Sequence, residues 1–177
     1  MKKIVLVYGS IAGLIVSSMF VITHSSGKID FDNGMFVGYA SMVIAFSLIF
    51  FGVKNYRDNH LAGAITFGRA FKVGLLVTLV ASVIYAVAWE FYFNLVVPDF
   101  MVEYTGHIIK KMETEGASAE EIAEARAQMK STSELYKNPL FRFLMTLLEI
   151  VPVGFVISLI CAALLRKTEF LPKNIDA

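Results

Sequence analysis

The sequence predicts an all-α membrane protein with four transmembrane helices and a helical hairpin outside the cytoplasm, between the third and fourth spans. The chain has 177 residues, and 56% of them are hydrophobic, more than the roughly 45–50% typical of soluble domains. These residues form four long apolar runs, each close to the about 20 residues that a helix needs to cross a bilayer. One charged segment, 99–138, separates the last two runs. We expect residues 1–177 to form a single membrane domain.

The first span is predicted at about residues 4–23. Lys2 and Lys3 precede an uncharged run that is longer than the 7–15 apolar residues of a secretory signal, so we interpret it as a membrane helix. Gly9 and Gly13 lie four residues apart and predict a face where a neighbouring helix approaches closely.

The second span is predicted at about residues 34–53, after a short polar turn. Its first turns contain another pair of glycines with the same spacing, Gly34 and Gly38. Because the connection is short, we expect the first two spans to be antiparallel neighbours.

The third span is predicted at about residues 73–97, and Thr66 is the expected N-cap of its helix. Small or polar residues recur at every fourth position, which is the spacing of a packing ridge. The members of this row are Gly74, Thr78, Ser82, Ala86, Glu90 and Asn94.

Residues 99–138 are predicted to form two helices separated by Gly116. Ser118 and Glu121 have the spacing of a capping box at the start of the second helix. The fourth span follows at about residues 143–165 and contains Glu149 and a second row of small residues that begins at Gly154.

Glu90 and Glu149 lie inside the apolar runs, each six or seven residues from the outer end of its span. At 1.5 Å per residue, both are expected roughly 10 Å below the outer membrane boundary, where a charged carboxylate is costly. One interpretation is an ion or proton site that also uses Ser82 and Asn94. The other, which we favour, is that the carboxyl groups hold the helices together through hydrogen bonds.

The Lys and Arg residues favour a cytoplasmic N-terminus and C-terminus. Nine of them fall on that side and seven on the other, and the nine lie in short segments next to span ends, where positive charge has the strongest influence on orientation. The nine are Lys2, Lys3, Lys54, Arg57, Arg69, Lys72, Arg166, Lys167 and Lys173. We therefore predict a multi-pass protein of the bacterial cytoplasmic (inner) membrane.

Three stretches resemble one known family. They are MKKIVLVYGSIAGLIVSSMF, GAITFGRAFKVGLLVTLVASVIYAVAWEFYFNLVVPDF and LMTLLEIVPVGFVISLICAALLRK. These stretches are similar to the domain of unknown function 4199 proteins, small four-span membrane proteins found mainly in Bacteroidota. The resemblance implies a four-helix bundle in the inner membrane, and it implies no activity and no catalytic residues.

No catalytic or nucleotide-binding motif is present, so we predict no enzyme activity, no cofactor and no metal site. A net charge of +1 gives no reason to expect nucleic acid as a partner. The leading hypothesis is a non-enzymatic structural or interaction protein that contacts the lipid bilayer. It would assemble with itself or with a membrane-protein partner through its glycine faces and its hairpin. The alternative is a small oligomeric transporter or ion-coupled component that uses Glu90 and Glu149.

Overall fold

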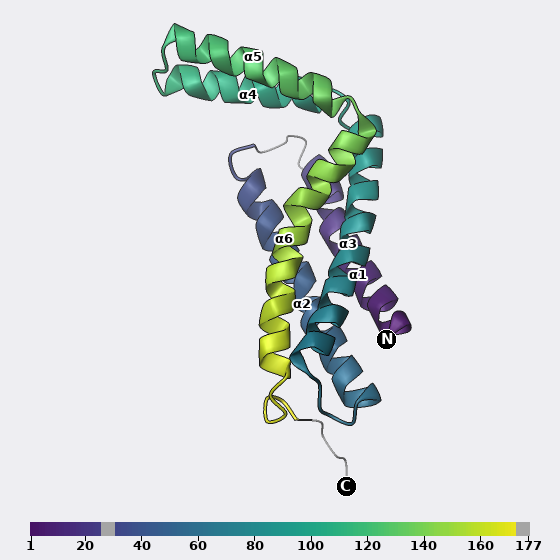
Figure 1. The fold of residues 1–177 in the computed structure, drawn as a ribbon. Coiled ribbons are helices and arrows are strands. Elements are labelled where there is room, and N and C mark those ends of the chain that lie inside the picture. Colours follow the sequence, from purple (N-terminus) through teal and green to yellow (C-terminus); the bar gives the residue numbers. More distant parts are fainter. Residues whose placement is uncertain (26–30, 173–177) are drawn as a thin grey trace.

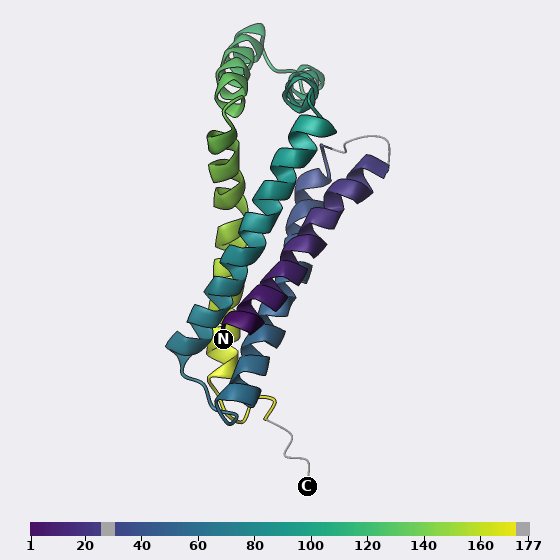
Figure 2. The same cartoon turned by 90° about the vertical axis from the view of Figure 1, so that its right-hand side faces the viewer.

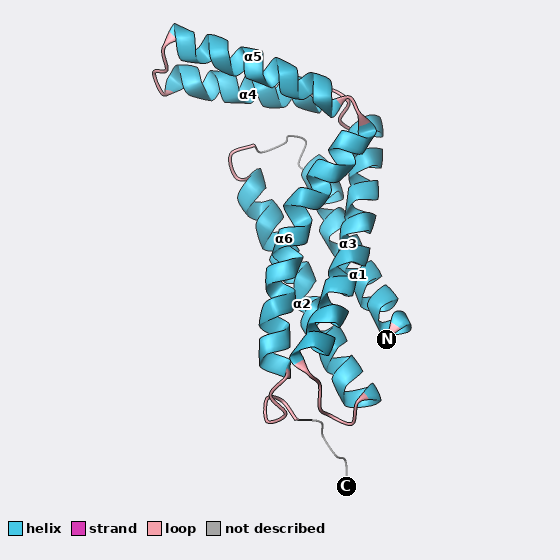
Figure 3. Ribbon diagram, viewed as in Figure 1, coloured by secondary structure: helices cyan, strands magenta, loops and turns pink. Residues whose placement is uncertain are grey.

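The computed structural model describes residues 1–25 and 31–172, and every regular element in that part is a helix (Figure 3). The elements are α1 (Lys2–Ser25), α2 (Gly34–His60), α3 (Phe67–Leu95), α4 (Phe100–Thr114), α5 (Ala119–Tyr136) and α6 (Pro139–Leu165). By length and composition, α1, α2, α3 and α6 are candidate membrane spans. The prediction of an all-α chain with four candidate spans is confirmed for the described residues.

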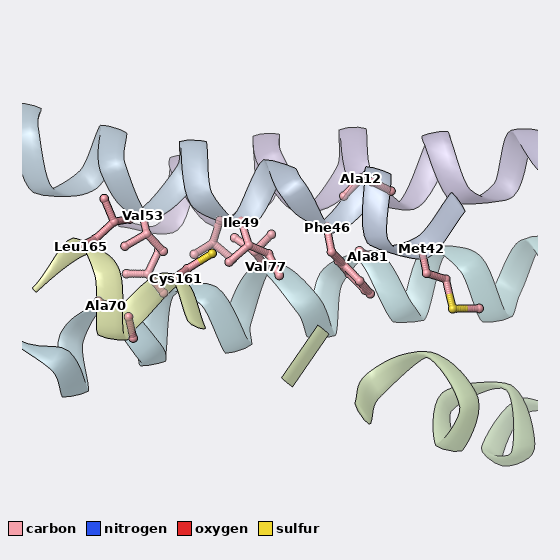
Figure 4. Packing of buried hydrophobic residues seen from close by; sticks show 14 of the residues in the cluster. Ala12, Met42, Phe46, Ile49, Val53, Ala70, Val77, Ala81, Cys161 and Leu165 are labelled. Atoms are coloured by element: carbon pink, nitrogen blue, oxygen red, sulfur yellow. The ribbon is translucent and has the colours of Figure 1, made fainter. Parts of the chain in front are cut away.

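The four long helices pack lengthwise against one another, and together they are called the long-helix core below (Figures 1 and 2). Helix α3 contacts α1, α2 and α6. Each of the four helices contributes buried apolar side chains, for example Ala12, Phe46, Val77 and Cys161 (Figure 4). The row of small residues predicted on α3 therefore lies on a helix that contacts all three other long helices.

The helices are longer than the apolar runs. Helix α2 continues to His60, seven residues beyond the predicted span, and Lys54 pairs with Asp58 one turn later in this extension. Helix α3 starts at Phe67, where the Thr66 side chain accepts a hydrogen bond from the Arg69 backbone as predicted. Such caps satisfy backbone N–H groups that have no partner inside the helix.

Helices α4 and α5 form the predicted hairpin, which extends sideways across one end of the long-helix core (Figure 1). Gly116 in the turn has a φ of +82°, a conformation that glycine adopts without steric cost. The predicted capping box of Ser118 and Glu121 is present at the start of α5. Phe31, from the connection between α1 and α2, lies against Tyr104 of α4 with 5.6 Å between ring centroids.

Candidate functional site

The seam between α3 and α6 is built from small side chains that let the two backbones approach closely. A Cβ placed on Gly74 would lie 2.9 Å from Ser158 Oγ, and one on Gly154 would lie 2.3 Å from Thr78 Cγ2. The hydroxyl groups of Thr78 and Ser158 are 3.3 Å apart. Close approach of this kind is how membrane helices gain packing energy without a hydrophobic driving force between them.

The seam keeps one antiparallel register along its length. Moving four residues forward from Thr78 along α3 gives Ser82, Ala86 and Glu90, and moving four residues back from Gly154 along α6 gives Ile150, Thr146 and Arg142. All of these residues except Glu90 are buried. The register therefore places Glu90 opposite Arg142, at the end of the seam nearest the hairpin.

Glu90 and Arg142 form a two-pronged ion pair. Arg142 Nε donates to Glu90 Oε1 at 3.0 Å, and Arg142 Nη2 donates to Glu90 Oε2 at 2.7 Å. The Arg142 side chain is 4% exposed and the Glu90 side chain 20% exposed. Such bidentate arginine–carboxylate pairs are strong and restrict the orientation of both side chains.

Arg142 also holds the end of the hairpin. Its Nη1 donates to the backbone carbonyl of Tyr136 at 2.7 Å and to that of Lys137 at 3.3 Å. Its guanidinium carbon lies 4.4 Å from the centre of the Phe93 ring, within the range of a cation–π contact. One side chain thus joins the end of α3, the end of α5 and the start of α6.

Of the other residues proposed for a polar site, the structure brings Asn94 to Glu90 and leaves Ser82 and Glu149 apart from it. Asn94 is exposed, and its side-chain amide donates to the Glu90 carbonyl oxygen at 2.6 Å and to Glu90 Oε2 at 3.5 Å. Ser82 is fully buried in the seam, and its Oγ has no hydrogen-bond partner among the described residues. Glu149 is exposed on α6 and forms no ion pair in the described part of the chain. The structure therefore pairs Glu90 with Arg142 and leaves Glu149 outside that pair.

Tyr136 lies beside this cluster at the end of α5. Burial raises the pKa of its phenol, and the pKa stays raised although the Trp89 side chain and the Arg142 charge act to lower it. Its ring packs edge-on against Phe93, with centroids 5.6 Å apart. Tyr136 is therefore a neutral contact between the hairpin and the long-helix core at physiological pH.

The glycines predicted to pack have two different roles. A Cβ on Gly9 would lie 2.7 Å from Val80 Cβ, and one on Gly13 would lie 2.9 Å from Ile84 Cβ, so both glycines lie where α1 crosses α3. At Gly34 and Gly38 the added Cβ would meet no described atom within 4 Å. These two glycines therefore do not bring helices together within the described part of the chain.

A second buried arginine lies at the opposite end of the long-helix core. Arg57 is fully buried and donates to Asp58 Oδ1 at 2.7 Å. Its two terminal nitrogens donate to the carbonyl groups of Phe170, at 2.9 Å, and of Leu171. This contact ties the end of α2 to the segment that follows α6.

Sequence reasoning missed the roles of both arginines. Both lie just outside the predicted spans, Arg57 after 34–53 and Arg142 before 143–165. For Arg142 a signal was available: continuing the small-residue row backwards from Gly154 in steps of four arrives at Arg142, as the forward row arrives at Glu90. Among the described residues, no group of three or more His, Cys, Asp or Glu side chains is close enough to hold a metal ion.

Four long apolar helices, an ion pair at one end of the α3–α6 seam and a projecting hairpin define a small α-helical protein with four candidate membrane spans. The chain belongs to the family described as "Protein of unknown function (DUF4199)", whose model matches residues 7–167. The resemblance noted in the sequence is thereby confirmed. Comparison with curated proteins and with solved structures gives no match.

Proposed function

We propose that this protein is a non-enzymatic structural or interaction component of the bacterial inner membrane that holds its α4–α5 hairpin in a fixed position outside the cytoplasm. The observation that carries the proposal is the Glu90–Arg142 pair. Arg142 contacts α3 through Glu90 and the last residues of the hairpin through two carbonyl groups. A buried arginine that makes four hydrogen bonds at a junction of three helices restricts how they can be oriented.

The same pair argues against Glu90 as a carrier of protons or cations. Both carboxylate oxygens of Glu90 already accept hydrogen bonds from Arg142. Binding of another cation by this carboxylate would therefore require the pair with Arg142 to break. The proposed role of Glu90 is therefore to connect α3 with α6 through its ion pair with Arg142.

The proposed orientation rests on the end of the molecule that lies away from the hairpin. The exposed basic residues at that end are Lys2, Lys3, Arg69, Lys72, Arg166 and Lys167. Positive residues next to spans favour the cytoplasmic side. An even number of crossings then puts both termini in the cytoplasm and the hairpin on the other side.

The proposal includes assembly, either with further copies of the chain or with a membrane-protein partner. Four of the predicted packing glycines already lie against other helices of the same chain, namely Gly9, Gly13, Gly74 and Gly154. Assembly would use the hairpin and the outer face of α2, where Gly34 and Gly38 leave room for a neighbouring backbone.

Affinity purification from native membranes tests the interaction function. The wild-type protein is expected to retain the same membrane proteins in repeated preparations. A variant with Glu90→Gln and Arg142→Gln is expected to retain them less well, because the hairpin base is no longer fixed. Partner retention that is unchanged when the hairpin base is released would contradict the proposal.

A second candidate function is a small ion-coupled or proton-coupled transporter that assembles as an oligomer, with Glu149 as its titratable group. The observation that favours it is that Glu149 lies within a candidate span without an ion-pair partner among the described residues. Ionisable groups in membrane spans commonly mark ion pathways. Proteoliposomes test this function directly: proton or cation flux with wild type that disappears in Glu149→Gln would establish it.

A further inference from the structure

The hairpin contains an open groove between α4 and α5 that the proposed function does not by itself explain. Its floor is apolar and includes Met101, Ile109 and Met129. Met101 and Ile109 are buried, whereas Val102 at the edge is 71% exposed. Helix α5 has 18 residues and no buried one. A helix pair with so little buried surface is marginal alone, and methionine side chains adapt well to different partners.

The groove opens away from the long-helix core. On α4, Tyr104 and Lys111 face the connection between α1 and α2, where they contact Phe31 and Asp32. Gly106, which lines the groove, is two residues from Tyr104 and therefore about 200° away around the helix. An occupant must consequently approach from the side opposite the membrane spans.

The charged side chains that line the groove and have no ion-pair partner among the described residues are basic. Lys110 and Lys130 line it and form no ion pair among the described residues. The two carboxylates of the lining already contact cations: Glu113 lies 3.4 Å from Arg126, and Glu134 lies 2.7 Å from Lys137. An occupant that completes the rim therefore carries carboxylates.

We infer that this groove binds an acidic amphipathic helix of a protein in the aqueous compartment. The inference deepens the proposed function and rests on it for the orientation of the hairpin. Helix α4 has 15 residues, so the groove is roughly 22 Å long, enough for about four turns of a bound helix. Apolar anchors at helical spacing with an acidic outer edge match the floor and the rim, as in other helix-in-groove complexes.

The geometry disfavours two other occupants. A second copy in the same membrane, related by a twofold axis along the membrane normal, would present its groove in the same direction, so two grooves could not face each other. The lipid of the same membrane lies on the opposite side of α4. Both occupants nevertheless remain distinguishable outcomes of the test.

The test uses the full-length protein in nanodiscs of zwitterionic lipid. The probe is a fluorescent 15-residue helical peptide of leucine, alanine and glutamate, and the matched control peptide has glutamine in place of each glutamate. Fluorescence anisotropy is expected to show binding of the acidic peptide at least tenfold tighter than that of the control. Lys110→Gln with Lys130→Gln is expected to weaken acidic-peptide binding about tenfold. Lys111→Gln, on the same helix but outside the groove, should leave binding unchanged.

Equal binding of both peptides, or equal loss with Lys111→Gln, would overturn the inference. So would anionic vesicles that displace the peptide from the groove, or a Val102→Cys variant whose copies cross-link in native membranes. These results are separable from the proposed function. Ion flux through wild-type proteoliposomes would rule out the proposed structural function even if the peptide binds. Partner retention that depends on the hairpin base would support that function even if the peptide does not bind.

Discussion

Arg57 and Arg142 are the least exposed charged residues in the described part of the chain. Each guanidinium donates to a carboxylate and to two or more backbone carbonyl groups. Arginine suits such positions because its planar group offers five donors in a fixed geometry. The carbonyl partners at Tyr136, Lys137, Phe170 and Leu171 lie outside the candidate spans, so each arginine fixes a connection as well as a helix.

A double-mutant cycle on Glu90 and Arg142 tests the ion pair. Arg142→Gln is expected to lower the free energy of unfolding more than Glu90→Gln, because it also removes the contacts with Tyr136, Lys137 and Phe93. We expect a coupling energy of about 1–3 kcal/mol, below the usual cost of breaking a fully buried pair because Glu90 is partly exposed. The measurement is reversible unfolding in mixed detergent. Additive single effects would show that the two side chains do not stabilise each other.

The contact between Gly154 and Thr78 gives a test of close packing. Gly154→Ala is expected to destabilise the protein by about 1–3 kcal/mol, because the new methyl group overlaps Thr78. Thr78→Ala in the same chain should restore much of this loss by removing the overlapping atoms. Gly38→Ala is the matched control: its added Cβ meets open space, so it should be neutral or slightly stabilising. Equal melting temperatures for the Gly154 and Gly38 variants would contradict close packing between α3 and α6 at Gly154.

At the scale of elements, α5 depends on local interactions more than the other helices do. It has no buried residue, and its first turn is held by the capping box, in which Glu121 accepts from the Ser118 backbone at 2.8 Å. The hydrogen bonds from Ser118 lower the pKa of the Glu121 carboxyl group. Stability that depends on a lowered pKa is present at neutral pH and is lost as pH falls through the folded-state value.

The start of α5 should therefore lose order as pH falls below about 4. Amide exchange, corrected for its intrinsic pH dependence, is expected to show falling protection at the first turn of α5 and unchanged protection in α3. Glu121→Gln is the control, because glutamine can still accept the capping hydrogen bond but cannot titrate. Its protection should stay constant over the same pH range. A parallel loss of protection in that variant would assign the effect to another group.

At the scale of the whole molecule, the proposed orientation predicts which residues face the outside of the cell. With Cys161 replaced by Ala, a single cysteine at Glu115 in the hairpin turn should react with a membrane-impermeant thiol reagent on intact cells. A single cysteine at Asn59, at the opposite end, should react only after the membrane is opened. The reverse pattern would show that the hairpin is cytoplasmic.

The apolar runs, the helical hairpin and both predicted caps could be derived from the sequence because each depends on local spacing. The Glu90–Arg142 pair depends on the register between α3 and α6, which no single helix specifies. Gly9 and Gly34 show the same limit. Each is the first glycine of a pair spaced four residues apart, but only Gly9 lies against another helix in the described structure. The sequence shows that a small residue lies on the surface of a helix, but tertiary packing determines whether another helix packs against it.

The carbonyl groups of Phe170 and Leu171 that Arg57 binds belong to a segment that the ribosome makes after α6. While α2 is being inserted, residues 165–171 do not yet exist, and a buried guanidinium without these acceptors would be costly. This end of α2 should therefore stay hydrated until α6 is complete, so that sealing of the long-helix core is a late step of biosynthesis. A nascent chain arrested at residue 164 is expected to be cleaved by added protease in the connection 61–66, whereas the completed chain should be protected there.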